Sequence, residues 1–250
     1  MLTVSNVVLE HIGRAGEDRY CSLKLPNLEL YAVFDGHGGS EVSEFLRATL
    51  PYRLLSKLQQ IDLTDPCAVK RTIVSAFLET DGEIAELKCK SGSTAVVALI
   101  LSDIIYLVNL GDSRGVIFNN RGEIYLRTSD HKPDRPDEKD RIYKAGGRVV
   151  NYDVPRIDSS GSYSLALSRA FGDMELKRPL ALVSVHPEVY ALPTREYIFG
   201  GLNIILASDG LWDTLSTEQV VRAHLNLPAV MNYACNKTTD DITVMFIKVV

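Results

Sequence analysis

Two mainly apolar stretches of this chain end in the same Asp-Gly pair. Leu28–Phe34 leads into Asp35-Gly36, and residues 203–208 lead into Asp209-Gly210. An apolar run of this length, bounded by glycine, predicts a buried strand, and the glycine allows a sharp turn directly after the carboxylate. We therefore expect two carboxylates, distant in sequence, at one edge of a sheet.

Further strands follow from short runs rich in Val, Ile and Leu. We expect them at residues 94–101, 104–110, 116–118, 123–126 and 242–250. The four residues 119–122, Asn-Asn-Arg-Gly, are typical of a hairpin turn between two of these strands. Most neighbouring strands are therefore predicted to be antiparallel.

The expected helices have start or stop signals. Ser40 can cap a helix that reaches about Leu50, and Asp65-Pro66 is a capping residue followed by a proline at the first helical position. Two more helices are expected at 137–145, closed by Gly146-Gly147, and from Ser216, whose capping box uses Gln219, to about Leu225. Hairpins combined with separate helical blocks predict an α+β fold with mainly antiparallel sheets.

Composition narrows the class of protein. The 250 residues are 46% hydrophobic with a net charge of −5, which suits a single domain over residues 1–250 with a substantial core. The mild acidity argues against a nucleic-acid partner. The start of the chain lacks the features of a signal peptide, and no stretch reaches the roughly 18 apolar residues of a membrane span. We expect no membrane association.

Four cysteines stand at positions 21, 67, 89 and 235. No pair has the CxxC spacing of a zinc site. We interpret them as reduced thiols, which predicts a cytoplasmic or nuclear location, or both.

Carboxylates at the two Asp-Gly turns favour hard cations, namely Mg²⁺, Mn²⁺ or Ca²⁺, because no histidine or cysteine cluster accompanies them. They also belong to an ordered series of short motifs. The series comprises Glu17-Asp18, 35–39 (DGHGG), 92–95 (GSTA), 109–114 (NLGDSR), 130–133 (DHKP), 167–173 (LSRAFGD), 209–213 (DGLWD) and 240–244 (DDITV).

From about residue 11 to 249, this series resembles the protein phosphatase 2C family, which are metal-dependent Ser/Thr protein phosphatases. The resemblance implies a four-layer sandwich of two antiparallel β-sheets flanked by α-helices. It also implies two Mg²⁺ or Mn²⁺ ions, with a possible third, and a segment at 151–163 that corresponds to a variable flap beside the site.

The resemblance assigns the metal ligands residue by residue. Asp35 would bridge the two ions, Glu17 and the backbone carbonyl of Gly36 would hold one, and Asp209 and Asp240 would hold the other. Asp241 directly follows Asp240, so either carboxylate of this pair could be the ligand. Asp112 matches a weaker third site that it would share with Asp209, but it could equally serve the turn before Ser113.

By the same resemblance, water activated at the binuclear centre would attack the phosphorus. His37 would protonate the leaving oxygen, since an imidazole pKa near ~6.5 suits a general acid. Arg14 is the candidate for phosphate binding; it stands four residues before Asp18, where the family usually has an arginine five residues before, and Arg19 is the alternative. The expected function is hydrolysis of phosphoserine and phosphothreonine on protein substrates by a monomer.

Other interpretations remain for the chain and for single residues. The whole chain could be a catalytically silent pseudophosphatase that acts as a binding or scaffold module, and a Ca²⁺-binding protein is disfavoured because no EF-hand loop is present. Asp130 and His131 are expected in a hydrogen-bonded structural turn, and Trp212 in the core. Ser93 lacks the G-x-S-x-G context of a nucleophile.

Overall fold

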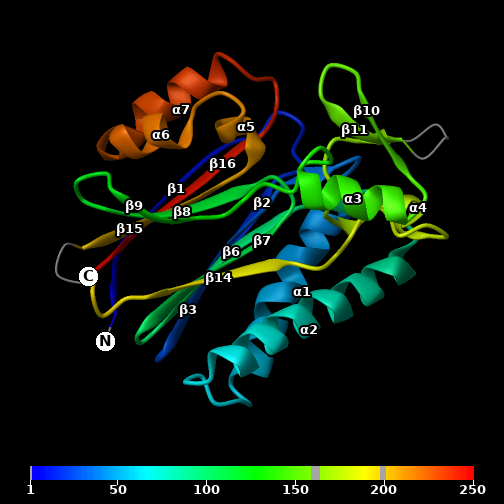
Figure 1. Cartoon of the computed structure of the whole chain (residues 1–250). Coiled ribbons are helices and arrows are strands. Elements are labelled where there is room, and N and C mark those ends of the chain that lie inside the picture. Colours follow the sequence, from blue (N-terminus) through cyan, green and yellow to red (C-terminus); the bar gives the residue numbers. More distant parts are fainter. Residues whose placement is uncertain (1, 159–163, 198–200) are drawn as a thin grey trace.

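Two five-stranded antiparallel sheets form the centre of the computed structural model, which describes residues 2–158, 164–197 and 201–250 (Figure 1). The first sheet contains, in order, β1 (Val4–Ile12), β16 (Ile242–Val249), β15 (Leu202–Ala207), β8 (Arg114–Asn119) and β9 (Ile124–Arg127). The second contains β14 (Glu188–Pro193), β7 (Ile104–Leu110), β6 (Ala95–Leu101), β3 (Leu28–Phe34) and β2 (Arg19–Leu25).

Strand β3 shows why the sheets stack. Side chains alternate between the two faces of a strand, and all seven residues of β3 are buried. Leu30 and Phe34 point into the core beneath helices, whereas Tyr31 and Val33 point into the core between the two sheets. A strand buried on both faces therefore needs a layer on each side.

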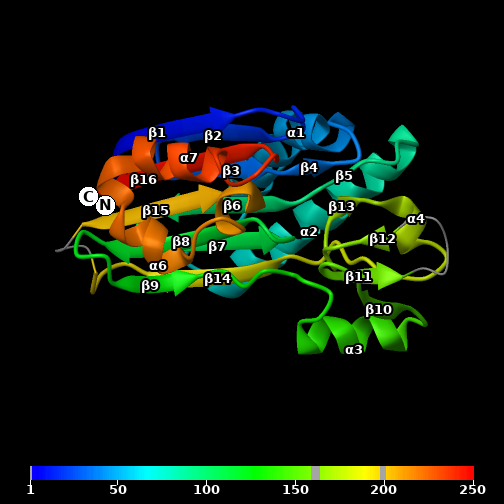
Figure 2. The same cartoon turned by 90° about the horizontal axis from the view of Figure 1, so that it is seen from above.

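Helices complete those layers. The long helices α1 (Glu41–Leu58) and α2 (Pro66–Ile84) cover the second sheet, and α5 (Asp209–Trp212), α6 (Thr217–Arg222) and α7 (Leu227–Cys235) cover the first (Figure 2). The order is helices, sheet, sheet, helices, which confirms the predicted α+β four-layer sandwich. None of the described helices is long and apolar enough to cross a bilayer.

Helix α1 corrects two predictions. Ser40 occupies the N-cap position but its side chain makes no capping hydrogen bond. The helix also continues eight residues beyond Leu50, through Pro51, to Leu58. Proline costs one helical hydrogen bond, but Leu54 and Leu58 lie in the core under the sheet, and their burial favours continuing the helix.

The other predicted helix signals hold. The Asp65 side chain accepts a hydrogen bond from the Cys67 N–H, and Ser216 and Gln219 form the capping box. Helix α6 ends at Arg222, earlier than expected, and a 3₁₀ turn at His224–Asn226 leads into α7, which the sequence pattern did not predict. The four cysteines are free, as expected.

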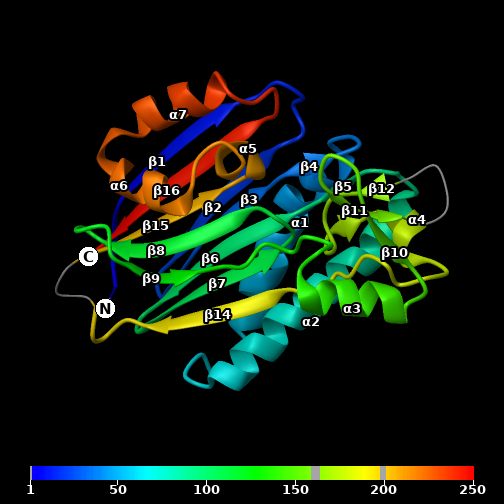
Figure 3. The same cartoon turned by 45° about the horizontal axis from the view of Figure 1, so that its top comes forward.

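Beyond one end of the sheets lies a smaller unit (Figure 3). It contains α3 (Pro136–Lys144), α4 (Met174–Lys177) and the three-stranded sheet β10 (Arg148–Asn151), β11 (Pro155–Asp158) and β12 (Ser164–Leu165). This unit has its own apolar cluster, which includes Ile142, Ile157 and Leu176. The expected flap at 151–163 overlaps β11, and its residues 159–163 lie outside the described residues.

A short three-stranded sheet lies between this unit and the central sandwich. It consists of β13 (Phe171–Gly172), β5 (Gly92–Ser93) and β4 (Gly36–His37). β4 follows β3 almost directly, so this small sheet connects the loop after Asp35 to the segment that carries α4.

Candidate active site

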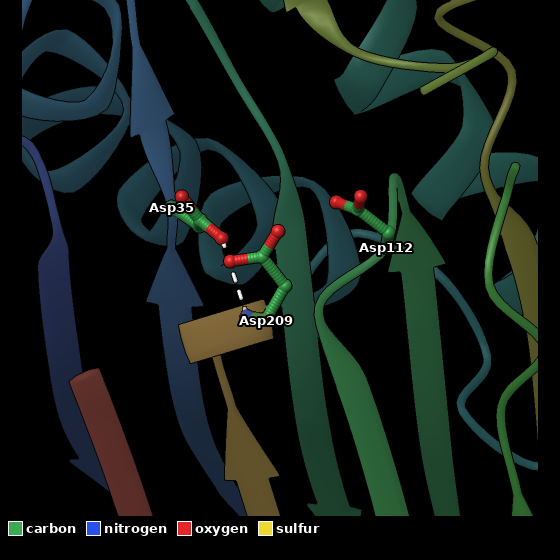
Figure 4. A group of neighbouring side chains, drawn as sticks. All are labelled: Asp35, Asp112 and Asp209. Atoms are coloured by element: carbon green, nitrogen blue, oxygen red, sulfur yellow. Dashed lines mark hydrogen bonds between the residues drawn. The ribbon is translucent and has the colours of Figure 1, made fainter. Parts of the chain in front are cut away.

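Three aspartates meet at one end of the stacked sheets (Figure 4). Asp35 follows β3, Asp112 follows β7, and Asp209 is the first residue of α5, separated by one residue from the end of β15. One carboxylate oxygen from each lies within 4.8 Å of the others. Strands from both sheets therefore deliver carboxylates to one place, as the two Asp-Gly turns predict, and Asp112 joins them.

Two of the three carboxylates, Asp35 and Asp209, have raised pKa values. Burial raises the pKa of Asp35 well above its usual range, and the charges of Asp209, Asp18 and Asp112 raise it further. The pKa of Asp209 is likewise raised well above its usual range by burial and by the charges of Asp112 and Asp213. A bound cation would relieve this repulsion, so the donor set suits a hard divalent ion.

Lys132 supplies positive charge at the edge of this group. Its Nζ lies 2.5 Å from Asp112 Oδ2, while Asp112 Oδ1 is buried without a hydrogen-bond partner in the described structure. Asp112 is only 3% exposed. Its carboxylate therefore has one oxygen neutralised by an ammonium group and one oxygen left to accept from a ligand.

The backbones of Glu17 and Gly36 lie close together. Glu17 Oε1 accepts a hydrogen bond from Gly39 N–H at 2.5 Å. A Cβ on Gly36 would stand 2.6 Å from the Glu17 carbonyl oxygen, so glycine is required there by the neighbouring backbone. Glu17 is not among the three carboxylates that lie within 4.8 Å of one another.

The Asp240-Asp241 pair divides into an outer and an inner carboxylate. Asp240 is exposed, and its charge helps to raise the pKa values of Asp35 and Asp209. Asp241 is 2% exposed and accepts backbone N–H bonds from all of residues 14–18, including those of Glu17 at 2.7 Å and Asp18 at 3.1 Å. Asp241 thus anchors the loop that carries Glu17, and Asp240 is the exposed carboxylate of the pair.

Asp18 is a further buried carboxylate near this loop. Burial raises its pKa to about 6, although hydrogen bonds from Thr243 and Ser208 oppose the shift. The Thr243 hydroxyl donates to Asp18 Oδ2 at 2.6 Å. Asp18 therefore ties the Glu17 loop to the start of β16.

His37 pairs with Asp173, the last residue of the LSRAFGD motif. Its Nε2 lies 2.9 Å from Asp173 Oδ2. Burial lowers the pKa of His37, but the hydrogen bond and charge of Asp173 outweigh this effect and raise the pKa above its ordinary value. A cationic ring is the form that a general acid requires.

The two arginines considered for phosphate binding have other partners here. Arg14 Nη2 donates to the Cys235 carbonyl at 2.7 Å and contacts Cys235 Sγ at 3.0 Å. Arg19 Nε donates to Glu44 at 2.5 Å, and its Nη1 donates to backbone carbonyls of the Glu17 loop. In the described structure, neither guanidinium group contacts the three clustered aspartates.

The sequence indicated no role for Lys132 or Asp173, although each lies within one of the motifs. It left Asp241 open as a metal ligand, whereas in the structure Asp241 binds the backbone of residues 14–18. Asp130 and His131, which precede Lys132, have structural hydrogen bonds, as expected, but lie in an irregular segment before the turn that starts at Pro133. Asp130 binds Arg114 through both oxygens, and His131 Nδ1 accepts the Gly111 N–H. Trp212 is 6% exposed and lies in the core under α6 and α7, also as expected.

A cavity of about 680 Å³ lies at the opposite end of β3 and β6. Leu63, Leu101, Ile104 and Pro193 form most of its apolar lining. None of the predicted site residues lines it.

Comparison with known proteins decides the family. A model of the family described as "Protein phosphatase 2C" matches residues 10–243. The chain belongs to the protein phosphatase 2C family. Probable protein phosphatase 2C 24 of Arabidopsis thaliana is 41% identical over 205 residues, which cover 75% of this chain and 53% of that protein. Protein phosphatase 1A of Homo sapiens is 35% identical over 234 residues, which cover 86% of this chain and 59% of that protein.

A solved phosphatase 2C structure has the same fold. The serine-threonine phosphatase 2C from Toxoplasma gondii superposes with a TM-score of 0.83 at 23% identity, covering 99% of this chain and 95% of that one. This likeness concerns the fold alone. The chain spans about half the length of curated relatives that it matches, namely 53% of probable protein phosphatase 2C 24 and 57% and 53% of probable protein phosphatase 1N of Mus musculus and Homo sapiens.

Proposed function

We propose that this protein is a Mg²⁺- or Mn²⁺-dependent phosphatase that hydrolyses phosphoserine and phosphothreonine on proteins. The observation that supports it most is the meeting of Asp35, Asp112 and Asp209 within 4.8 Å, in a chain of the protein phosphatase 2C family. Residues 1–250 would act as one catalytic domain.

The donor set fits divalent cations. Its members are carboxylate oxygens, burial and neighbouring negative charges raise the pKa values of Asp35 and Asp209, and Asp112 Oδ1 is buried without a partner in the described residues. Asp35 would contact two ions, with Glu17 and the Gly36 carbonyl on one and Asp209 and Asp240 on the other; Asp112 could hold a third. Such ions lower the pKa of a shared water and neutralise charge on phosphoryl oxygens.

The chain itself would orient the reacting groups. Asp241 holds the backbone of residues 14–18, so the side chain of Glu17 starts from a fixed position. His37, two residues after Asp35, would give a proton to the leaving serine or threonine oxygen. An alkoxide is a poor leaving group, so this proton transfer would matter most for protein substrates.

We retain Arg14 as the proposed phosphate-binding residue, because its position in the sequence resembles that of the family's phosphate-binding arginine. In the structure its guanidinium group binds Cys235, so engagement of a phosphate would require that this contact break. Substrates would be phosphoproteins, and we propose a monomer located in the cytoplasm, the nucleus or both. A catalytically silent module is disfavoured, because the chain retains His37 together with the carboxylate group.

A chromogenic assay tests this proposal. Purified protein should hydrolyse an aryl phosphate when Mn²⁺ is present, and Asp209→Asn should reduce the rate by several orders of magnitude. An exposed aspartate such as Asp62 offers the matched control, because Asp62→Asn removes the same charge far from the site. Equal activity of the Asp209 and Asp62 variants would refute the assigned site.

A further inference from the structure

We propose that Asp173 is the positioning residue for His37: its carboxylate holds Nε2 and leaves Nδ1 as the nitrogen that passes a proton to the substrate. This inference rests on the proposed function, in which His37 acts as the general acid. It assigns a role to the last residue of the LSRAFGD motif.

The small sheet β13-β5-β4 brings the two side chains together. In its register, His37 on β4 lies opposite Gly92 on β5, and Gly172 on β13 lies opposite the same Gly92. Asp173 follows Gly172 directly. The pair therefore sits on a hydrogen-bonded backbone frame that spans 136 residues of sequence.

Gly92 makes room for the contact. A Cβ at this position would overlap both Asp173 Oδ2 and His37 Nε2, the two atoms that form the hydrogen bond. The histidine and the aspartate thus meet directly above a residue without a side chain. Any larger residue at position 92 would separate them.

The Asp173 carboxylate is directed to the histidine by its backbone. Asp173 adopts a left-handed conformation, with φ of 50°, which aspartate tolerates better than most residues. It stands at the N-cap position of α4, yet its side chain makes no capping hydrogen bond. Its side chain is fully buried, whereas that of His37 is 23% exposed.

This geometry decides which ring nitrogen reacts. An ionised carboxylate only accepts hydrogen bonds, so Nε2 carries a hydrogen and donates it to Asp173. In the cationic ring Nδ1 also carries a hydrogen. As the P–O bond breaks, its electron pair stays on the leaving oxygen, which takes the Nδ1 proton, and the ring is left neutral with Nε2–H still bound to Asp173.

The test compares two substrates with Mn²⁺ present. Asp173→Asn keeps the size of the side chain and tolerates the left-handed backbone, but its amide can offer a donor to Nε2. We expect kcat on a phosphothreonine peptide to fall roughly 10-fold or more, within the range that a general acid contributes. On p-nitrophenyl phosphate, whose phenolate leaves without a proton, the loss should stay below about 3-fold.

A double variant separates positioning from a structural role. In a His37→Gln background, Asp173→Asn should cause no further loss on the peptide, because the residues act as a unit. The matched control is Asp81→Asn. Asp81 is a buried carboxylate of the same region that accepts the Gly172 N–H and binds Lys177 at 2.6 Å, and it makes no hydrogen bond to His37. This variant should affect both substrates alike.

A spectroscopic readout is independent of turnover. In ¹⁵N–¹H spectra of the folded protein, the ring signal of His37 is identified by its absence in His37→Gln. This signal should show that the neutral ring carries its hydrogen on Nε2. Asp173→Ala should remove this preference. Equal losses on both substrates, an additive double variant, or a wild-type ring with hydrogen on Nδ1 alone would overturn the inference. If the wild type hydrolyses neither substrate, the proposed function fails, while the spectrum still decides the His37–Asp173 contact.

Discussion

Removing one charge from the three-aspartate group should stabilise the metal-free protein. The change is Asp35→Asn, which keeps the shape of the side chain. The carboxylate oxygens of Asp35, Asp112 and Asp209 lie within 4.8 Å of one another. At an effective dielectric constant of about 20, two unit charges at that separation repel by about 3.5 kcal/mol.

Two effects make the repulsion between these carboxylates smaller at neutral pH. Lys132 neutralises part of the charge on Asp112, and the raised pKa values of Asp35 and Asp209 mean that the group takes up protons more readily than in the unfolded chain. We therefore expect Asp35→Asn to raise the free energy of unfolding by roughly 2 kcal/mol in EDTA at pH 7. For a domain of this size that corresponds to a rise in melting temperature of roughly 4–8 °C.

The pH dependence has a defined sign. A carboxyl group whose folded-state pKa is raised destabilises the folded protein above that pKa, and the penalty fades as the pH falls through it. The difference between wild type and Asp35→Asn in urea denaturation should therefore shrink as the pH is lowered from 7. Asp18, with a pKa of about 6, adds a penalty of the same sign in the wild type and the variant.

Metal should reverse the ranking. Mn²⁺ that binds the folded state should raise the melting temperature of the wild type and have little effect on Asp35→Asn. The matched control is Asp130→Asn, which removes a carboxylate bound to Arg114 at 2.6 Å and should lower stability with or without metal. A less stable Asp35→Asn protein in EDTA, or one that Mn²⁺ stabilises as much as the wild type, would refute the electrostatic argument.

Two further substitutions test the frame of the site. Asp241→Ala removes the acceptor of the five N–H bonds from residues 14–18 and should cost roughly 3 kcal/mol in urea denaturation at pH 7. Burial raises the pKa of Asp241, but those backbone bonds outweigh it and lower the pKa to about 2. The contribution of Asp241 to the free energy of unfolding should therefore be lost as the pH falls from about 4 toward 2. A loss of stability in Asp241→Ala that does not change with pH would contradict this. Glu138 is buried and lies 2.6 Å from Arg169 and 2.9 Å from Arg141. Glu138→Gln should lower the free energy of unfolding by roughly 3 kcal/mol. An unchanged melting temperature would contradict a stabilising role for this buried cluster.

Strong local patterns predicted the centre of the fold. The apolar run that forms β3 is buried on both faces, and the aspartate after it lies in the carboxylate group, as its position implies. The capping signals at Asp65 and Ser216 likewise mark real helix starts. In each case the side chain and its immediate neighbours suffice to determine the local structure.

Features that depend on tertiary contacts could not be predicted in this way. Strand β1 lies at a sheet edge with mixed burial, so its sequence lacks a clean alternation, and β2 is an edge strand too. Pro51 is accommodated because the leucines that follow it are buried under the second sheet. The separate roles of Asp240 and Asp241 depend on a loop more than 220 residues away, which no local pattern reveals.

The most direct test of the central claim follows one sample through removal and return of metal. Protein stripped with EDTA should release no phosphate from a phosphothreonine peptide, and Mn²⁺ added in excess of the chelator should restore turnover, while Asp35→Asn should stay inactive throughout. Full turnover in excess EDTA, or recovery of Asp35→Asn to the wild-type rate with Mn²⁺, would contradict the assignment of this carboxylate group as the metal centre of a phosphatase.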